Sequence, residues 1–292
     1  MQTGTTVELE IVDLGSSGEG IGRAEGLAVF VPGALPGDVV TAEITENKGR
    51  FAKGRLISVE KPSTDRIEAD CPYFGRCGGC SLRNYRYEAQ LAWKERFVTE
   101  NLKRIGSIDD PVVKPILGDP DPYCYRNKAE FAIVKDQVGY YAPGSHTLIP
   151  IDECRIQQGP AVALARAMSA FLKKHPKNIY RHLVVRISDE GKIMVILVVN
   201  KDEVSRAQEL ADCLVDAVIE PYELVSIVVN INKASDKQVL GPDCKFLAGP
   251  RVLKDHLITD AGVLNVEVSP LSFYQVNPRQ TSRLYSKVQT YA

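Results

Sequence analysis

Three cysteines lie within ten residues of this chain, in the sequence CPYFGRCGGC. Cys71, Cys77 and Cys80 have the spacing C-x5-C-x2-C, and the whole chain contains seven cysteines. Thiolates at such spacing are ligands for zinc or for an iron–sulfur cluster. The two glycines between the last two cysteines let the backbone approach and donate N–H groups to sulfur. The sequence therefore predicts a metal centre in this segment.

A tetrahedral metal or a cubane cluster needs a fourth ligand. Cys154 lies in the polar connecting segment IPIDECRIQQG, from which a side chain can project toward another loop. Cys213 and Cys244 lie in settings that favour simple packing, and Cys124 is left open. Structural zinc usually takes paired C-x2-C knuckles, so one pair plus a single cysteine favours iron–sulfur, with zinc as the alternative.

Composition limits the classes of function. The chain has 292 residues, 44% of them hydrophobic, which is enough for two or three domains. The net charge of −1 argues against a wholly basic nucleic-acid binder. We expect a cytoplasmic protein with no membrane segment, because no signal peptide and no run of 18 apolar residues is recognisable. In that compartment clustered cysteines are more often metal or redox groups than disulfides.

The first sixty residues read as short strands. TVELEIVDLG alternates apolar and acidic residues with a period of two, and the similar runs LAVFVPG, DVVTAEIT and FAKGRLISV are separated by turn residues. We therefore expect a small five-stranded barrel over residues 1–60.

The region 61–267 mixes helices and strands. A helix is expected at 85–105, with Leu91, Val98, Leu102 and Ile105 at helical spacing. Further strands are expected at 129–141, at 223–233 and in a hairpin over 182–200 that turns near Glu190. Further helices are expected at 161–175 and 202–219. Without a strict βαβ rhythm, this region should be an α+β domain.

The last residues, SFYQVNPRQTSRLYSKVQTYA, predict another helix. Leu284 and Val288 on that helix have no following element to pack against. We therefore expect a truncated chain.

The combined motifs resemble a known family. CPYFGRCGGC with a distant ECRIQ, after a small barrel and before YRNKAEF and SFYQVNP, is similar to RNA uracil-C5 methyltransferases with an N-terminal TRAM domain, across essentially the whole chain. The resemblance implies a [4Fe-4S] cluster on Cys71, Cys77, Cys80 and Cys154. It also implies that 268–292 begins a Rossmann-like methyltransferase domain and that helix 85–105 packs on it.

The resemblance also nominates binding residues. Gln275 would contact S-adenosylmethionine, and Phe273, two residues away on a common strand face, would stack on an extruded uridine. The barrel would bind RNA through its one basic stretch, NKGRFAKGR, and YRNK would offer further donors. The candidate RNA contacts are Lys48, Arg50, Lys53, Arg55, Arg126, Asn127 and Lys128.

In this family a cysteine thiolate adds to C6 of uracil, C5 takes the methyl group, and a base removes the C5 proton. No residue of this chain is assigned to the nucleophile or the base, which we expect downstream, and no glycine-rich donor site is visible. We therefore predict that the 292-residue chain is inactive by itself. The resemblance favours 23S ribosomal RNA over transfer RNA as the substrate, and a monomer at full length.

Two other functions fit the same residues. One is a non-catalytic RNA-binding module with a structural metal site, and the other is an iron–sulfur redox sensor. Methyl transfer through a thiolate adduct needs no electron, which favours a structural or RNA-positioning role for the cluster.

Overall fold

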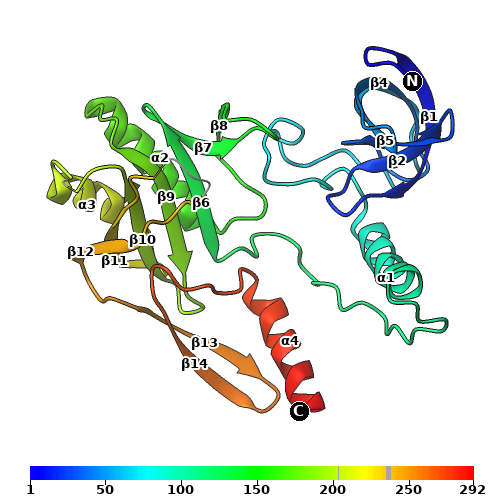
Figure 1. Ribbon diagram of the computed structural model, residues 1–292. Coiled ribbons are helices and arrows are strands. Elements are labelled where there is room, and N and C mark those ends of the chain that lie inside the picture. Colours follow the sequence, from blue (N-terminus) through cyan, green and yellow to red (C-terminus); the bar gives the residue numbers. More distant parts are fainter. Residues whose placement is uncertain (203, 235–237) are drawn as a thin grey trace. The chain divides into compact units, whose positions relative to one another are not determined.

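Five strands close into a barrel in the computed structural model, which describes residues 1–202, 204–234 and 238–292 (Figure 1). They are β1 (Thr6–Leu14), β2 (Gly20–Ala24), β3 (Leu27–Val31), β4 (Val39–Asn47) and β5 (Phe51–Lys61). The barrel order is β1-β2-β3-β5-β4, and the parallel pair β3–β5 completes the closure. The predicted barrel is confirmed.

Alternation of side chains explains this barrel. Leu9 and Ile11 of β1 are buried in its core, whereas the alternating residues Glu8 and Glu10 are exposed. Residues of β3 and β4, such as Val29 and Ile44, fill the same core. A strand period of two therefore separates the apolar interior from a charged exterior.

A buried ion pair fixes the chain where it leaves the barrel. The Asp38 side chain is fully buried and accepts hydrogen bonds from the backbone N–H groups of Leu35 and Ser63, at 2.7 and 2.8 Å. The Arg66 guanidinium donates to both Asp38 oxygens, at 3.0 and 2.5 Å, and to the Gly33 carbonyl at 2.8 Å.

Helix α1 (Tyr87–Arg104) confirms the helix expected at 85–105. Its buried residue is Trp93, which packs with Tyr85, Leu14 and Leu35 of the same compact unit. Val98 and Ile105 of the predicted apolar stripe are 48% and 81% exposed. The side of the helix that packs within its own unit is therefore the Trp93 side rather than the stripe.

The chain divides into two compact units, Met1–Gly118 and Asp119–Ala292. The domain boundaries expected after residues 60 and 267 do not coincide with this division and stay predictions.

The second unit is built on a seven-stranded mixed sheet in the order β12-β11-β10-β9-β6-β7-β8. Its strands are β6 (Lys128–Val134), β7 (Gln137–Tyr141), β8 (Leu148–Pro150), β9 (Tyr180–Ile187), β10 (Lys192–Val199), β11 (Glu223–Ile231) and β12 (Asp243–Ala248). Among the described strands of this sheet, β10 and β11 pair in parallel and the other neighbours are antiparallel, and α3 (Ala207–Asp216) lies between β10 and β11 in the sequence. The hairpin expected near Glu190 is confirmed by the antiparallel pair β9–β10.

Both faces of the central strands are covered. Helices α2 (Gly159–Lys174) and α3 contact strands of the sheet and each other. Met194, Ile196 and Val198 of β10 pack instead in a cluster with residues of the hairpin β13 (Leu253–Thr259) and β14 (Gly262–Val268). Burial on both sides explains why β10 reads as a continuous apolar run, KIMVILVV.

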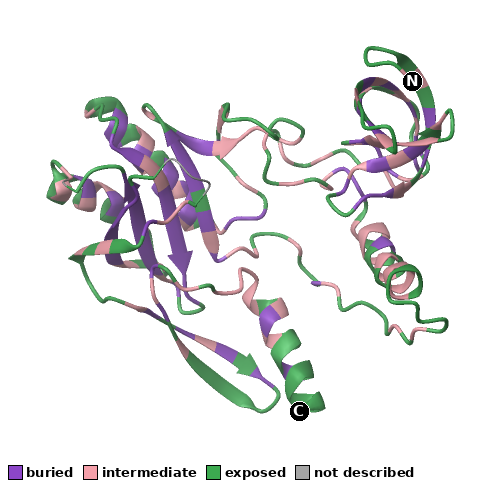
Figure 2. Cartoon of the chain, in the orientation of Figure 1, coloured by how far each residue is buried: buried purple, intermediate pink, exposed green. Residues whose placement is uncertain are grey.

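The remaining helices agree with the sequence in position. Helices α2 and α3 confirm the two helices expected at 161–175 and 202–219, although α3 is shorter and residue 203 lies outside the described residues. Helix α4 (Pro278–Tyr291) confirms the last one, and much of its surface is exposed (Figure 2). Within the described residues, no helix combines the length and apolar character needed to cross a membrane.

Candidate functional site

The segment 269–277 joins β14 to α4 without forming a helix or a strand. It begins with a turn in which the hydroxyls of Ser269 and Ser272 lie 2.7 Å apart and each accepts a hydrogen bond from the other residue's backbone N–H. It ends at Asn277, whose side chain accepts from the Gln280 N–H and caps α4. The segment is therefore anchored at both ends.

Phe273 projects from this segment with 86% of its surface exposed. Phe273 is therefore not a core residue, and its ring can contact a ligand in solvent. Gln275 is half-buried. The expectation that both residues share a strand face is also wrong, because the segment is not a strand.

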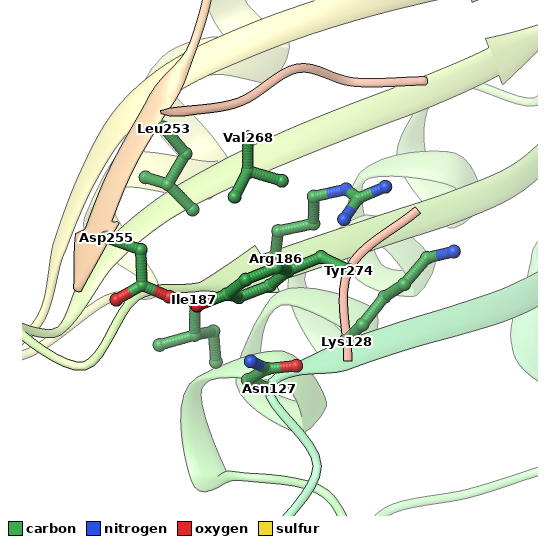
Figure 3. Close-up of a pocket in the computed structure, with 8 residues that line it drawn as sticks. All are labelled: Asn127, Lys128, Arg186, Ile187, Leu253, Asp255, Val268 and Tyr274. Carbon is green, nitrogen blue, oxygen red and sulfur yellow. The ribbon is translucent and has the colours of Figure 1, made fainter. Parts of the chain in front are cut away.

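Tyr274, between them, turns inward. Its ring lies in a pocket lined by residues of β6, β9 and the β13–β14 hairpin, and Figure 3 shows its hydroxyl directed toward the Asp255 carboxylate. The lining residues are Asn127, Lys128, Arg186, Ile187, Leu253, Asp255, Val268 and Tyr274. Alternation of exposed Phe273 with inward Tyr274 is thus what presents the phenylalanine ring.

Arg186 is the buried cation of this pocket, whereas Lys128 is only half-buried. Arg186 is 3% exposed, and its Nη2 donates to the carbonyl oxygens of Ser272 at 2.5 Å and Pro270 at 3.3 Å. Burial lowers the pKa of Arg186, and the nearby Glu130 carboxylate opposes that shift. A guanidinium stays charged at neutral pH despite such burial, so the two carbonyls receive charge-assisted hydrogen bonds.

Asp255 and Tyr274 interact electrostatically. Asp255 accepts hydrogen bonds from the backbone N–H groups of Asp189 and His256, both at 2.9 Å. Burial, and then the neighbouring Asp255 carboxylate, raise the pKa of the Tyr274 hydroxyl. That hydroxyl is fully buried, and it approaches Asp255 without the geometry of a complete hydrogen bond. Tyr274 is therefore neutral at physiological pH.

The three candidate RNA contacts in YRNK differ in their surroundings. Asn127 is buried and lines the pocket; its backbone N–H donates to the Val276 carbonyl at 3.0 Å. Arg126 and Lys128 are half-buried, and Lys128 forms an ion pair with Glu130 at 2.5 Å. Asn127 thus holds the 269–277 segment through its backbone, while Arg126 and Lys128 keep solvent-accessible side chains.

The basic stretch of the barrel lies at the β4–β5 turn. Lys48 and Lys53 form ion pairs with Glu46, and Arg55 pairs with Glu43. Arg50 is exposed and makes no ion pair within the described residues. Of the four candidate RNA contacts in the barrel, Arg50 carries the charge that is not already compensated.

The cysteine loop is closed at its base. Ile67 and Arg86 donate backbone hydrogen bonds across it, and Arg83 binds both oxygens of Asp70. Cys71, Cys77 and Cys80 are half-buried cysteines on this loop.

The loop offers part of what a metal centre needs. The Gly79 N–H donates to the Cys77 sulfur at 3.4 Å, which is the kind of contact that stabilises a metal-bound thiolate. However, among the described residues no three His, Cys, Asp or Glu side chains gather as a metal site. Cys154 lies in the second unit. The chemistry of the loop fits a metal centre, whereas a converged ligand set is not present.

Two other cysteines have structural surroundings. The Cys213 sulfur lies 3.8 Å from the Ala167 carbonyl oxygen between α3 and α2, and burial raises the pKa of its thiol. Cys244 on β12 contacts the Asn230 amide at 3.3 Å. Both agree with packing roles.

Arg186, Tyr274 and Asp255 were not among the residues singled out from the sequence. One signal was present, since Arg186 interrupts the apolar strand HLVVRIS and a charge in a buried strand needs partners. Those partners lie 84 and 86 residues further along the chain, so the sequence alone did not indicate them.

Comparisons with known proteins identify a TRAM domain and similarity to RNA methyltransferases. Residues 1–57 match the TRAM domain. An uncharacterized RNA methyltransferase of Caldanaerobacter subterraneus is 36% identical over 306 residues, which cover 100% of this chain and 66% of that protein. An uncharacterized RNA methyltransferase of Clostridium tetani is 35% identical over 303 residues, covering 99% of this chain and 64% of that protein.

A solved structure shares the fold. It is the Pyrococcus abyssi tRNA (uracil-54, C5)-methyltransferase in complex with S-adenosyl-L-homocysteine, with a TM-score of 0.74 and 22% sequence identity, covering 97% of this chain and 64% of that one. The chain thus spans slightly less than two thirds of the length of these curated relatives. On the sequence similarity and the TRAM match, the chain belongs to the family of TRAM-domain RNA methyltransferases.

Proposed function

We propose that the protein containing this chain methylates C5 of a uridine in RNA, with S-adenosylmethionine as the methyl donor. The observation that carries the proposal is Phe273, an aromatic ring held 86% exposed on an anchored segment. A ring in this state can stack on an unstacked base, which is how enzymes that modify a base commonly receive it. Membership of an RNA methyltransferase family and the TRAM barrel support the same reading.

The reaction must overcome the weak nucleophilicity of C5. A cysteine thiolate adds to C6, the electron density that reaches C5 forms the bond to the methyl group, and a base then removes the C5 proton so that the thiolate leaves. S-adenosylmethionine supplies the electrophilic methyl group. We assign neither the nucleophile nor the base to a residue of this chain.

This chain's own residues would bind and orient the RNA. Arg50 and the Arg126 and Lys128 side chains would contact phosphates or base edges, and Phe273 would stack on the target base. Gln275 is half-buried next to Phe273, so its amide can meet a ligand beside the ring. It does not line the pocket of Figure 3, and one amide alone does not define a donor site.

The cluster remains part of the proposal as a structural element. Cys71, Cys77, Cys80 and Cys154 would bind it, supported by the spacing, by the half-burial of these cysteines and by the Gly79 N–H. No step of the reaction is routed through it. A cytoplasmic location belongs to the same proposal, because the reducing cytoplasm keeps cysteine thiols from forming disulfides.

The test is transfer of a radiolabelled methyl group by the natural gene product that contains this chain. Transcripts of 23S ribosomal RNA and of transfer RNA are offered separately, and the product nucleoside is identified as 5-methyluridine. We expect modification of the 23S transcript. Modification of transfer RNA alone would contradict the ribosomal assignment, and RNA binding without any methyl transfer would favour the non-catalytic module.

A further inference from the structure

The ring of Phe273 is exposed, yet the backbone that carries it is held by three separate contacts. Arg186 Nη2 binds the carbonyls of Pro270 and Ser272, and the Asn127 N–H binds the carbonyl of Val276. The third contact is the inward ring of Tyr274 (Figure 3). An exposed side chain with a fixed backbone is preorganised for binding, because its backbone entropy has already been lost.

We propose that Arg186 is the positioning residue for the base-stacking ring. From inside the sheet it holds the two carbonyls that precede Phe273, so that the ring stands in solvent in one orientation. The inference rests on the proposed function for the identity of the ligand, an unstacked base of RNA, but its structural part can be tested without RNA.

Burial makes this role specific to arginine. Arg186 is 3% exposed and lies on β9, which pairs with β6 inside the sheet. A buried cation that can lose its proton would become neutral there, because burial disfavours the charged form. Arginine keeps its charge there, and one of its nitrogens reaches two carbonyls of the same turn. Tyr274 contributes by filling the pocket beside it with a neutral ring.

A matched control lies on the same strand. Arg181 of β9 also donates to two backbone carbonyls, those of Asn232 and Ala234, which lie away from the 269–277 segment in sequence. Replacing Arg181 removes the same number of similar contacts. It should leave the segment before α4 unchanged.

The first experiment measures backbone order without RNA. The 292-residue chain contains eight phenylalanines, so selective ¹⁵N-phenylalanine labelling gives a short set of amide signals, and Phe273→Leu identifies the one of interest. We expect an order parameter of about 0.85 for the Phe273 amide, falling below about 0.6 in Arg186→Met. Arg181→Met should keep the higher value, and Arg186→Lys should restore part of it.

The second experiment measures binding of a single-stranded, uridine-containing oligonucleotide labelled with 2-aminopurine. Ordering one freed residue on binding should weaken affinity about five- to thirtyfold in Arg186→Met. If Arg186→Met does not fold, Arg186→Lys serves as the test, because lysine keeps a cation at this position but has no guanidinium to reach both carbonyls.

The outcomes separate the two ideas. An ordered Phe273 amide in Arg186→Met, or an order parameter in Arg186→Lys equal to that of the unmodified chain, would overturn the positioning role, whatever the RNA result. A disordered Phe273 amide in Arg186→Met would support the positioning role. If the unmodified chain then failed to bind the oligonucleotide, that second result would count against the proposed RNA ligand.

Discussion

The Arg66 guanidinium binds both oxygens of the fully buried Asp38 carboxylate at the point where the chain leaves the barrel. This pair joins the barrel to the segment that precedes the cysteine loop. A buried carboxylate that loses its cation is destabilising, because the charge stays out of water without compensation.

Arg66→Met should therefore lower the free energy of unfolding of the first unit by about 3 kcal/mol. Arg55→Met, which removes the exposed pair with Glu43, should cost less than about 1 kcal/mol. Urea titration followed by fluorescence of Trp93, the single tryptophan, reports on this unit. Equal losses in the two variants would contradict the role assigned to Asp38.

The charges at the β4–β5 turn predict opposite effects of two substitutions on RNA affinity. Arg50→Ala should weaken RNA binding and reduce the slope of log affinity against log salt by about one. Glu46→Gln should strengthen binding, because Lys48 and Lys53, which now hold the pKa of Glu46 below its usual value, would be released to contact phosphates. Filter binding over a salt series measures both, and weaker binding by Glu46→Gln would exclude this face of the barrel.

The sequence predicted the elements better than their contacts. The barrel follows from a period of two in residues such as Leu9 and Ile11, which is a local pattern. The buried side of α1 was not predicted, because a single large side chain, Trp93, outweighs the row of smaller apolar residues that defined the stripe. Packing of one large aromatic ring is decided by the shape of its partners, which periodicity does not report.

The candidate site divides in the same way. Phe273 and Gln275 were found from a motif, and the exposure of Phe273 agrees with the role that motif implies. Arg186 and Tyr274 act through a tertiary contact between β9 and the segment before α4, so local sequence could indicate only that a buried charge existed. The candidate ligand-binding residues could therefore be predicted from the sequence, whereas the residues that hold them in place could not.

His182 on β9 should make the second unit sensitive to acid. Burial, assisted by the positive charge of Arg181, lowers the pKa of His182, and Glu130 opposes that shift. The unfolded chain then binds a proton more readily than the folded one. Stability is fully present above the ordinary histidine pKa and decreases as pH falls toward the lowered pKa of the folded state.

The measurement is the midpoint of thermal unfolding at about pH 7.5 and about pH 5. His182→Gln removes the titrating group, so its midpoint should fall less between these conditions than that of the unmodified chain. The other three histidines are present in both proteins and cancel in the comparison. An identical fall in both would mean that His182 does not contribute to the acid sensitivity.

The cysteine loop gives the last prediction. Protein purified without oxygen should contain iron and acid-labile sulfide, and Cys77→Ala should lose both, because it removes the thiol that receives the Gly79 N–H. Cys213→Ala should retain them, since that sulfur lies between α3 and α2 against a backbone carbonyl. Stoichiometric zinc without iron in the unmodified chain would replace the cluster by a zinc site. Retention of iron and sulfide by Cys77→Ala would remove Cys77 from the ligand set.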